Sequence, residues 1–127
     1  MITKFWHVGL TVKDLDEAIA QYEELGFKLV QKFKKSEPKA LAAHLNHSSG
    51  SGIEIFQWFD KNHPQVEFIK SHLAFISDDI DEDITKLLDR GYTMVIPKSA
   101  GVTVSYFTFL KDPGGNYIEL AELKGNT

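Results

Sequence analysis

The stretch Asp112–Glu122, DPGGNYIELAE, joins a tight turn to a short strand with a carboxylate at its centre. Proline presets φ and the two glycines can adopt φ > 0, which is typical of a hairpin turn. Side chains alternate along the strand that follows, so Glu119 points away from Ile118 and Leu120. A carboxylate among apolar neighbours is costly unless a partner, such as a metal ion, compensates it. From this stretch alone, Glu119 is either such a ligand or a solvent-facing residue of an edge strand.

An internal repeat relates the two halves of the chain. An offset of 65 residues aligns His7 with His72 and Glu54 with Glu119, without gaps (54 − 7 = 119 − 72 = 47). The same offset aligns further residues in pairs, among them Asp14 with Asp79, Gly26 with Gly91 and Val30 with Val95. Each copy begins with a histidine on a strand and ends with a glutamate on a strand. We therefore predict that pseudo-twofold symmetry brings two imidazoles and two carboxylates together.

The composition is that of an ordinary globular domain. The length of 127 residues predicts a single domain over residues 1–127. A net charge of −4 and the lack of a basic stripe argue against binding of nucleic acid. The chain has no cysteine, so any metal must be held by nitrogen and oxygen ligands. No apolar run approaches the length of a membrane span or a signal peptide, and we expect a cytoplasmic protein without membrane partners.

The first repeat, about residues 5–59, is predicted to form a strand, a helix and three further strands. Asp14 is expected to cap the helix and Gly26 to end it. The buried stripe of this helix is expected to be Leu15, Ile19, Tyr22 and Leu25. The expected elements are strand 5–12, the helix, strand 27–33, a solvated loop over 32–39, strand 40–46, a hairpin loop over 48–52 and strand 53–59.

The second repeat, about residues 68–122, follows a candidate linker over residues 60–65 and is predicted to have the same plan. Its expected elements are strand 68–77, helix 80–90 and strands 92–96, 102–110 and 116–122. The predicted fold class is α+β, with two tandem βαβββ repeats forming curled mixed sheets. Their concave faces are expected to form a cup that carries four residues, His7, Glu54, His72 and Glu119.

Three features of the chain resemble a known family. They are the opening HVGLTVKDLDEAIAQYEELGF from residue 7, the second repeat strand at His72 and the closing DPGGNYIEL. Together they resemble the vicinal oxygen chelate superfamily, the glyoxalase, bleomycin-resistance and dioxygenase fold, and in particular its small bacterial glyoxalase-like proteins. The resemblance covers essentially the whole chain and implies one divalent metal at the four cup positions. Many members that only sequester a drug lack these ligands, so the complete set here implies an enzyme.

The ligand types indicate which metals and which chemistry to expect. Imidazole and carboxylate ligands suit Ni²⁺, Co²⁺ or Zn²⁺, and also Mn²⁺ or Fe²⁺. The metal would act as a Lewis acid that stabilises an enediolate. The expected activity is that of a metal-dependent lyase or isomerase on a small oxygenated substrate, thiol adducts included. By similarity to glyoxalase I, Glu119 is the first choice for the catalytic base and Glu54 the second.

Six further residues are candidates for a place at the site. Thr11 shares a strand face with His7, Phe56 and Trp58 share a face with Glu54, and Tyr117 shares one with Glu119. These four are expected to bind substrate, although aromatic residues in strands are more often packing residues. His44, on a weak strand, and His47, beside a Ser/Gly loop, are expected to be structural.

One departure from the glyoxalase pattern leaves the thiol cofactor open. Glutathione-dependent members hold the peptide with arginines, and Arg90 is the single arginine of this chain. The alternatives are an epimerase or thiol transferase of the same superfamily, or a protein that sequesters an antibiotic or another small molecule without a metal. An extradiol dioxygenase fits less well, because a second glutamate would fill a position that oxygen or substrate needs. The resemblance also implies a homodimer, with the metal site either within one chain or shared between two.

Overall fold

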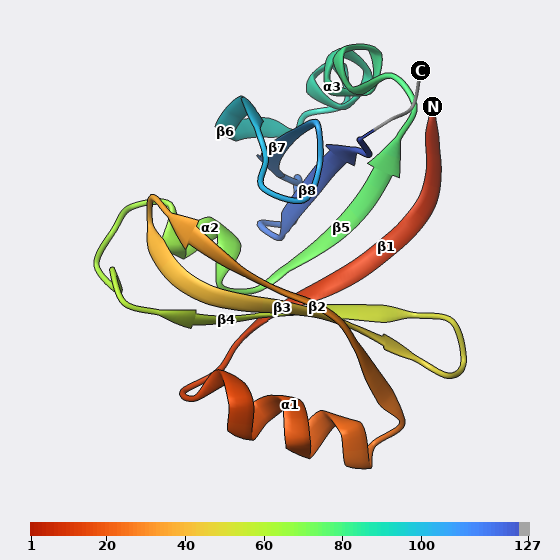
Figure 1. The fold of residues 1–127 in the computed structure, drawn as a ribbon. Coiled ribbons are helices and arrows are strands. Elements are labelled where there is room, and N and C mark those ends of the chain that lie inside the picture. The colour runs from red at the N-terminus through yellow and green to blue at the C-terminus, as the bar shows by residue number, and fades with distance from the viewer. Residues whose placement is uncertain (125–127) are drawn as a thin grey trace. The chain divides into compact units, whose positions relative to one another are not determined.

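The computed structural model describes residues 1–124 and divides into two compact units (Figure 1). The N-terminal unit comprises His7–Ser71, and the C-terminal unit comprises Met1–Trp6 together with the chain from His72 onward. Strand β1 (Ile2–Thr11) contributes its first half to the C-terminal unit and its second half to the N-terminal unit.

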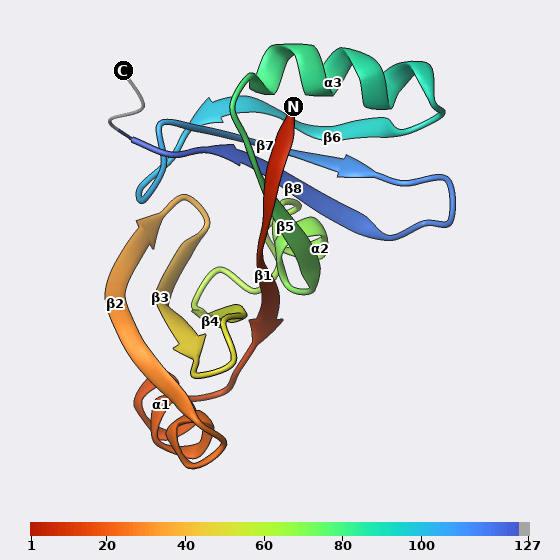
Figure 2. The same ribbon diagram turned by 90° about the vertical axis from the view of Figure 1, so that its right-hand side faces the viewer.

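The N-terminal unit forms a mixed sheet in the order β2-β3-β4-β1. Strand β1 is parallel to β4, with Gly9 opposite Glu54, and the other neighbouring strands are antiparallel. Figure 2 shows β2 and β3 bowed along their length. The elements after β1 are α1 (Leu15–Glu24), β2 (Phe27–Ser36), β3 (Lys39–His47), β4 (Gly52–Trp58) and α2 (Val66–Ile69).

The C-terminal unit repeats the plan, in the order β1-β5-β8-β7-β6. Strand β5 is parallel to β8, with Ala74 opposite Glu119, just as β1 is parallel to β4 in the other unit. Its elements are β5 (His72–Ser77), α3 (Ile80–Asp89), β6 (Thr93–Ala100), β7 (Tyr106–Lys111) and β8 (Tyr117–Glu122). The predicted α+β class with two βαβββ repeats is confirmed.

Equivalent residues begin and end the two long helices. The Asp14 carboxylate accepts a hydrogen bond from the Glu17 backbone N–H at 2.9 Å, and Asp79 accepts one from Glu82 at 3.1 Å. These bonds satisfy N–H groups that have no partner within the helix. Gly26 follows α1 with φ of +99° and Gly91 follows α3 with φ of +92°, a conformation that residues other than glycine adopt only with strain.

Each helix packs on one face of its own sheet and so determines which side chains point the other way. In the N-terminal unit Leu15, Ala18 and Ile19 of α1 contact a buried aliphatic layer that includes Ile53 and Ile55. In the C-terminal unit α3 contacts the corresponding layer, in which Ile80 and Ile84 meet Leu110 and Leu120. Figure 2 shows α3 lying along its sheet. Because side chains alternate, Glu54 and Glu119 lie on the opposite face of their sheets, here named the cup face of each unit.

Several predicted boundaries were wrong in the N-terminal unit. Residues 32–36 are not a loop but the end of β2, because Lys34 and Lys35 pair with Leu41 and Ala40 of β3. The predicted helix stripe included Leu25, which is 64% exposed because α1 ends at Glu24.

Two predicted strands of the second repeat were also too long. Residues 68–71 are not part of β5: a helical turn that buries Val66 and Ile69, α2, occupies residues 66–69. Residues 102–105 precede β7, and Val104 turns into a cluster with Ile76 and Ala121. Strand β6 extends to Ala100, beyond the predicted end at Ile96. Over the described part of the chain, no helix is both long enough and apolar enough to cross a membrane.

Candidate functional site

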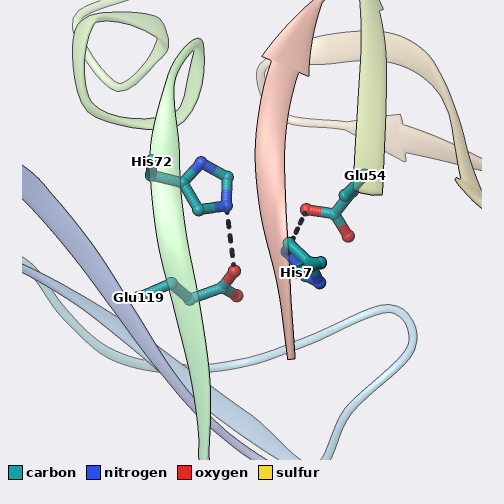
Figure 3. Close-up of side chains that lie close together, drawn as sticks. All are labelled: His7, Glu54, His72 and Glu119. Carbon is teal, nitrogen blue, oxygen red and sulfur yellow. Dashed lines mark ion pairs between the residues drawn. The ribbon is translucent and has the colours of Figure 1, made fainter. Parts of the chain in front are cut away.

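The N-terminal unit places a histidine and a glutamate side by side on its cup face. His7 lies on β1 and Glu54 on the adjacent strand β4, and the register places Gly9 opposite Glu54. The Nε2 atom of His7 lies 3.3 Å from Oε1 of Glu54 (Figure 3). Both side chains are buried. The parallel pairing of β1 and β4 therefore produces the predicted His–Glu pair.

A second histidine contacts Glu54 from the other side. His44 lies on β3, directly opposite Glu54 in the antiparallel register. Its Nε2 is hydrogen-bonded to the second carboxylate oxygen, Oε2. The His44 ring lies 5.5 Å from the His7 ring and 5.1 Å from the Phe33 ring, centroid to centroid. Glu54 is thus held between two imidazoles within one unit.

The surroundings of Glu54 keep its carboxyl group ionised. Burial raises the pKa of Glu54, because a charged group loses its hydration. Hydrogen bonds from His44 and His7, and the attraction of their positive charge, lower it by more, so the pKa lies well below its ordinary value. An ionised carboxylate is the form that a divalent cation binds.

The C-terminal unit contains the equivalent pair. His72 on β5 lies with its Nε2 3.2 Å from Oε1 of Glu119 on β8, and both side chains are buried (Figure 3). The residue opposite Glu119 on the neighbouring strand β7 is Phe109. Its ring lies 4.8 Å from the His72 ring in an edge-to-face arrangement. Phe109 offers Glu119 no hydrogen bond, in contrast to the role of His44 beside Glu54.

His44 was expected to be structural, so its contact with Glu54 was not predicted. The 65-residue offset aligns His44 with Phe109, so the two repeats differ at the position that faces each glutamate. This difference between otherwise matched strands was the available signal. The Nε2 atom of His47, also expected to be structural, lies 2.8 Å from the carbonyl oxygen of Leu25 at the end of α1.

Two of the four expected substrate residues line a cavity in the N-terminal unit. Trp58 Nε1 donates to Thr11 Oγ1 at 3.0 Å, and Thr11 in turn donates to the Lys70 carbonyl at 2.9 Å. Phe56 is buried and stacks on Trp58, and Tyr117 is half-buried on β8 of the other unit. The cavity has a volume of about 1110 Å³ and is lined by Leu10, Thr11, Val12, Lys13, Gln57, Trp58, Phe59, Lys61, Val66, Lys70 and Ser71. Three lysines thus surround an apolar floor.

The donor set within each pair fits a divalent metal ion. Two ligands about 2.1 Å from an ion and at right angles to each other lie about 3.0 Å apart. The nitrogen–oxygen separations of 3.3 Å and 3.2 Å in the two pairs are close to that value. Each of the four residues offers one imidazole nitrogen or carboxylate oxygen. These are the ligands that Ni²⁺, Co²⁺, Zn²⁺, Mn²⁺ and Fe²⁺ accept in proteins.

Comparison with known proteins yields relatives that span nearly the whole chain. Methylmalonyl-CoA epimerase from Mycobacterium tuberculosis is 28% identical, with a TM-score of 0.80, over 96% of this chain and 89% of that chain. A Streptomyces coelicolor methylmalonyl-CoA epimerase variant in complex with 2-nitronate-propionyl-CoA shares the fold, at 23% identity and a TM-score of 0.79 over 98% of this chain and 100% of that chain. Uncharacterized protein YwbC of Bacillus subtilis (strain 168) is 27% identical over 123 residues, 94% of this chain and 97% of that protein.

A family model matches residues 4–120, which include both His–Glu pairs and both repeats. The match agrees with the resemblance seen in the sequence. The chain belongs to the Glyoxalase/Bleomycin resistance protein/Dioxygenase superfamily.

Proposed function

We propose that this protein is a divalent-metal-dependent isomerase or lyase that moves a proton on a carbon next to a carbonyl group. The observation that carries the proposal is the repeated, buried His–Glu pair: His7 with Glu54, and His72 with Glu119. Burying a carboxylate costs free energy unless a partner or a bound ion compensates its charge. In this chain a buried carboxylate lies beside an imidazole twice. In this proposal the four side chains hold one ion, as the complete ligand set and the family support.

The ion, when bound, supplies a Lewis acid for a substrate with two neighbouring oxygens. Glu119 acts as the base and takes the proton from the substrate carbon. The C–H electron pair then forms the new carbon–carbon double bond, and the carbonyl π pair moves to oxygen, which gives an enediolate or enolate. Return of the proton to the neighbouring carbon completes an isomerisation, and return to the opposite face of the same carbon completes an epimerisation.

The first substrate class is a hemithioacetal, on which the isomerisation is the glyoxalase reaction. Hemithioacetal substrates differ from one another in the thiol that they contain. Arg90, the single arginine, is the residue after α3, the helix that packs on the face of its own sheet opposite the cup face. We therefore propose that the thiol is not one whose carboxylates are bound by arginine side chains.

The second substrate class is a thioester with a carbon acid next to its carbonyl, on which the reaction is an epimerisation. Two observations favour it. The Mycobacterium tuberculosis methylmalonyl-CoA epimerase matches with 28% identity over most of both chains. Lys13, Lys61 and Lys70 also line the cavity beside Thr11 and Trp58, which suits a substrate with an apolar body and an anionic end.

Proton exchange with solvent tests the proposal. The protein is loaded in turn with Ni²⁺, Co²⁺, Zn²⁺ or Mn²⁺ and incubated in D₂O with a hemithioacetal or with a branched acyl thioester. We expect deuterium at the reacting carbon with one substrate class, loss of exchange on adding a chelator, and recovery on adding metal. If these compounds bind but no deuterium is incorporated with any of the four metals, the protein sequesters a small molecule and is not an enzyme of this type.

A cytoplasmic location and a homodimer remain part of the proposal. Sedimentation equilibrium at micromolar concentration distinguishes a dimer from a monomer of 14.4 kDa. Metal titration during the same measurement shows whether the ion is shared between chains, because a shared ion makes the dissociation constant of the dimer depend on the metal concentration.

A further inference from the structure

The cavity of the N-terminal unit lies at the ends of the two parallel strands that carry the first His–Glu pair. Thr11 is four residues beyond His7 on β1, and Trp58 is four residues beyond Glu54 on β4. An even separation keeps these side chains on the cup face and places the cavity about 13 Å from the pair, at about 3.3 Å per residue. Neither His7 nor Glu54 lines the cavity. The cavity is therefore separate from the pair, although the same two strands form both.

We propose that this cavity binds the thiol carrier of the substrate and that the carrier ends in phosphate groups. The reacting acyl group then lies at the His7–Glu54 pair, while the charged end of the carrier lies at the far end of β1 and β4. The inference rests on the proposed metal-dependent function and deepens it, because it selects the thioester of a phosphorylated carrier over the hemithioacetal of a small thiol.

The charges around the cavity favour a polyanion. Lys13, Lys61 and Lys70 line it, and none of the other described lining residues carries a carboxylate, although the chain has a net charge of −4. The Nζ atom of Lys70 lies 2.8 Å from Oε1 of Glu67, whereas Lys13 and Lys61 form no ion pair within the described part of the chain. Three cations complement a group with several negative charges better than a single carboxylate. Lysine binds phosphate as a point charge, whereas planar carboxylates favour the arginine fork.

The apolar side of the cavity suits the body of such a carrier. The Nε1 of Trp58 donates to Thr11 Oγ1 at 3.0 Å, and the indole stacks on Phe56 at 4.8 Å between centroids. The Thr11 hydroxyl donates to the Lys70 carbonyl at 2.9 Å, which holds the segment after α2 against β1. A wall held by these contacts has little conformational freedom to lose when a ligand binds. The cavity volume of about 1110 Å³ exceeds the range of about 300 to 1,000 Å³ that is common for small-molecule sites, so it has room for a long carrier.

The C-terminal unit differs from the N-terminal unit at the aligned positions. Where the N-terminal unit has a cation, a hydroxyl and an indole, the offset of 65 residues finds an anion and two aliphatic side chains: Lys13, Thr11 and Trp58 align with Asp78, Ile76 and Leu123. The His–Glu pairs are the same in both repeats and so distinguish no orientation of the substrate. The charge difference does, because it attracts an anionic carrier to the N-terminal unit and repels it from the equivalent position of the other.

Binding of coenzyme A to the metal-free protein tests the inference apart from catalysis, because this compound is a phosphorylated thiol carrier without an acyl group. Isothermal titration calorimetry compares it with pantetheine, which has the same thiol arm and no phosphate. Lys13→Ala, Lys61→Ala and Lys13→Asp change the charge of the cavity, and Trp58→Leu removes its aromatic wall. Lys28→Ala is the matched control, since it removes an exposed charge on β2 of the same unit, outside the cavity. Urea denaturation shows that each variant is folded.

We expect coenzyme A to bind about tenfold or more tightly than pantetheine, with an affinity that falls as salt screens the lysines. Lys13→Ala and Lys61→Ala should each weaken its binding by about tenfold, through loss of one charge-assisted contact, and Lys13→Asp should weaken it further. Pantetheine should bind these lysine variants as it binds the wild type. Trp58→Leu should weaken binding of both compounds, and Lys28→Ala of neither.

Kinetics at saturating metal then relate the cavity to the substrate. A branched acyl thioester of coenzyme A should have a lower KM than the same acyl group on N-acetylcysteamine, with a similar kcat, because the phosphates bind far from the reacting carbon. Lys13→Ala should raise KM for the coenzyme A thioester and leave KM for the phosphate-free thioester unchanged.

Equal affinities for coenzyme A and pantetheine, wild-type affinity in both lysine-to-alanine variants, or equal KM values for the two thioesters would overturn the inference. If Trp58→Leu does not fold, the variants of the exposed Lys13 and Lys61 decide the question. Failure of the proposed function gives a different result: coenzyme A binds as expected, but no deuterium enters either thioester with any metal. Exchange on the phosphate-free thioester without binding of coenzyme A would retain the function and overturn the inference alone.

Discussion

In the N-terminal unit the strand opposite Glu54 carries His44, whereas in the C-terminal unit the strand opposite Glu119 carries Phe109. The helix-facing sides of the same strands correspond closely, with aliphatic residues packed under α1 and under α3. A repeat must keep its apolar pattern in both copies, because each helix needs a layer to pack on. The cup faces are free to diverge, and they do so at the position opposite each glutamate, which is His44 in one unit and Phe109 in the other.

The largest expected difference between the units is catalytic. Glu119→Gln keeps an oxygen near the metal but removes the proton acceptor, so kcat should fall by about 10² to 10⁴ with substrate affinity largely kept. Glu54→Gln should lower kcat less and weaken metal binding more. Steady-state kinetics at saturating metal, with metal content determined in parallel, measure both. Full turnover by Glu119→Gln would show that Glu119 is not the base and would assign that role to Glu54.

The apolar layers of the two units, by contrast, should lose similar amounts of stability when an equivalent leucine is truncated in each. Leu45 and Leu110 are aligned by the repeat, both are fully buried, and each packs in the cluster of its own unit. Leu45→Ala and Leu110→Ala should each lower the free energy of unfolding by about 2 to 5 kcal/mol, from lost burial and a residual cavity. Urea denaturation of the metal-free protein measures the two values. A difference of more than about 3 kcal/mol between them would mean that the two layers are not equivalent.

The smallest effect is expected at the turns. Asp112 accepts hydrogen bonds from the backbone and side chain of Asn116, and these lower the pKa of its carboxyl group. The stabilisation is therefore present above the ordinary pKa of aspartate and is lost as the pH falls through the lowered value. The turn between β3 and β4, Ser48–Ser51, contains no carboxylate.

Asp112→Asn should consequently lower the melting temperature at neutral pH and converge with the wild type in acid. Melting curves between pH 2 and pH 7 follow this convergence. A difference between the two proteins that stays constant down to pH 2 would show that the carboxylate charge of Asp112 is not the cause.

The sequence predicted the parts of the fold that depend on local chemistry. The turn before β8, the alternation around Glu119 and the helix cap at Asp14 were predicted correctly, because each depends on residues close in the chain. It did not predict the extension of β2, since a lysine-rich edge strand has the composition of a loop. Helix α2 was missed because four residues have no helical period, and only the burial of Val66 and Ile69 shows why it forms.

The two His–Glu pairs were predicted from the repeat, and the structure brings each pair together within its unit. The contact of His44 with Glu54 was not predicted, because it depends on the register between β3 and β4. That register is set by where the hairpin turns within residues 48–51, and a shift of one residue would point His44 to the other face. A composition-based reading of a weak strand cannot supply it.

The central claim is that both His–Glu pairs hold one and the same ion. It is tested most directly by the metal content of the protein purified without chelator, measured by plasma mass spectrometry for the wild type, His7→Ala and His72→Ala. The account predicts one divalent ion per chain in the wild type and almost none in either variant, because each removes a ligand of the same site. Two ions per wild-type chain, or one ion retained in each variant, would show that the pairs bind separately and would contradict the account.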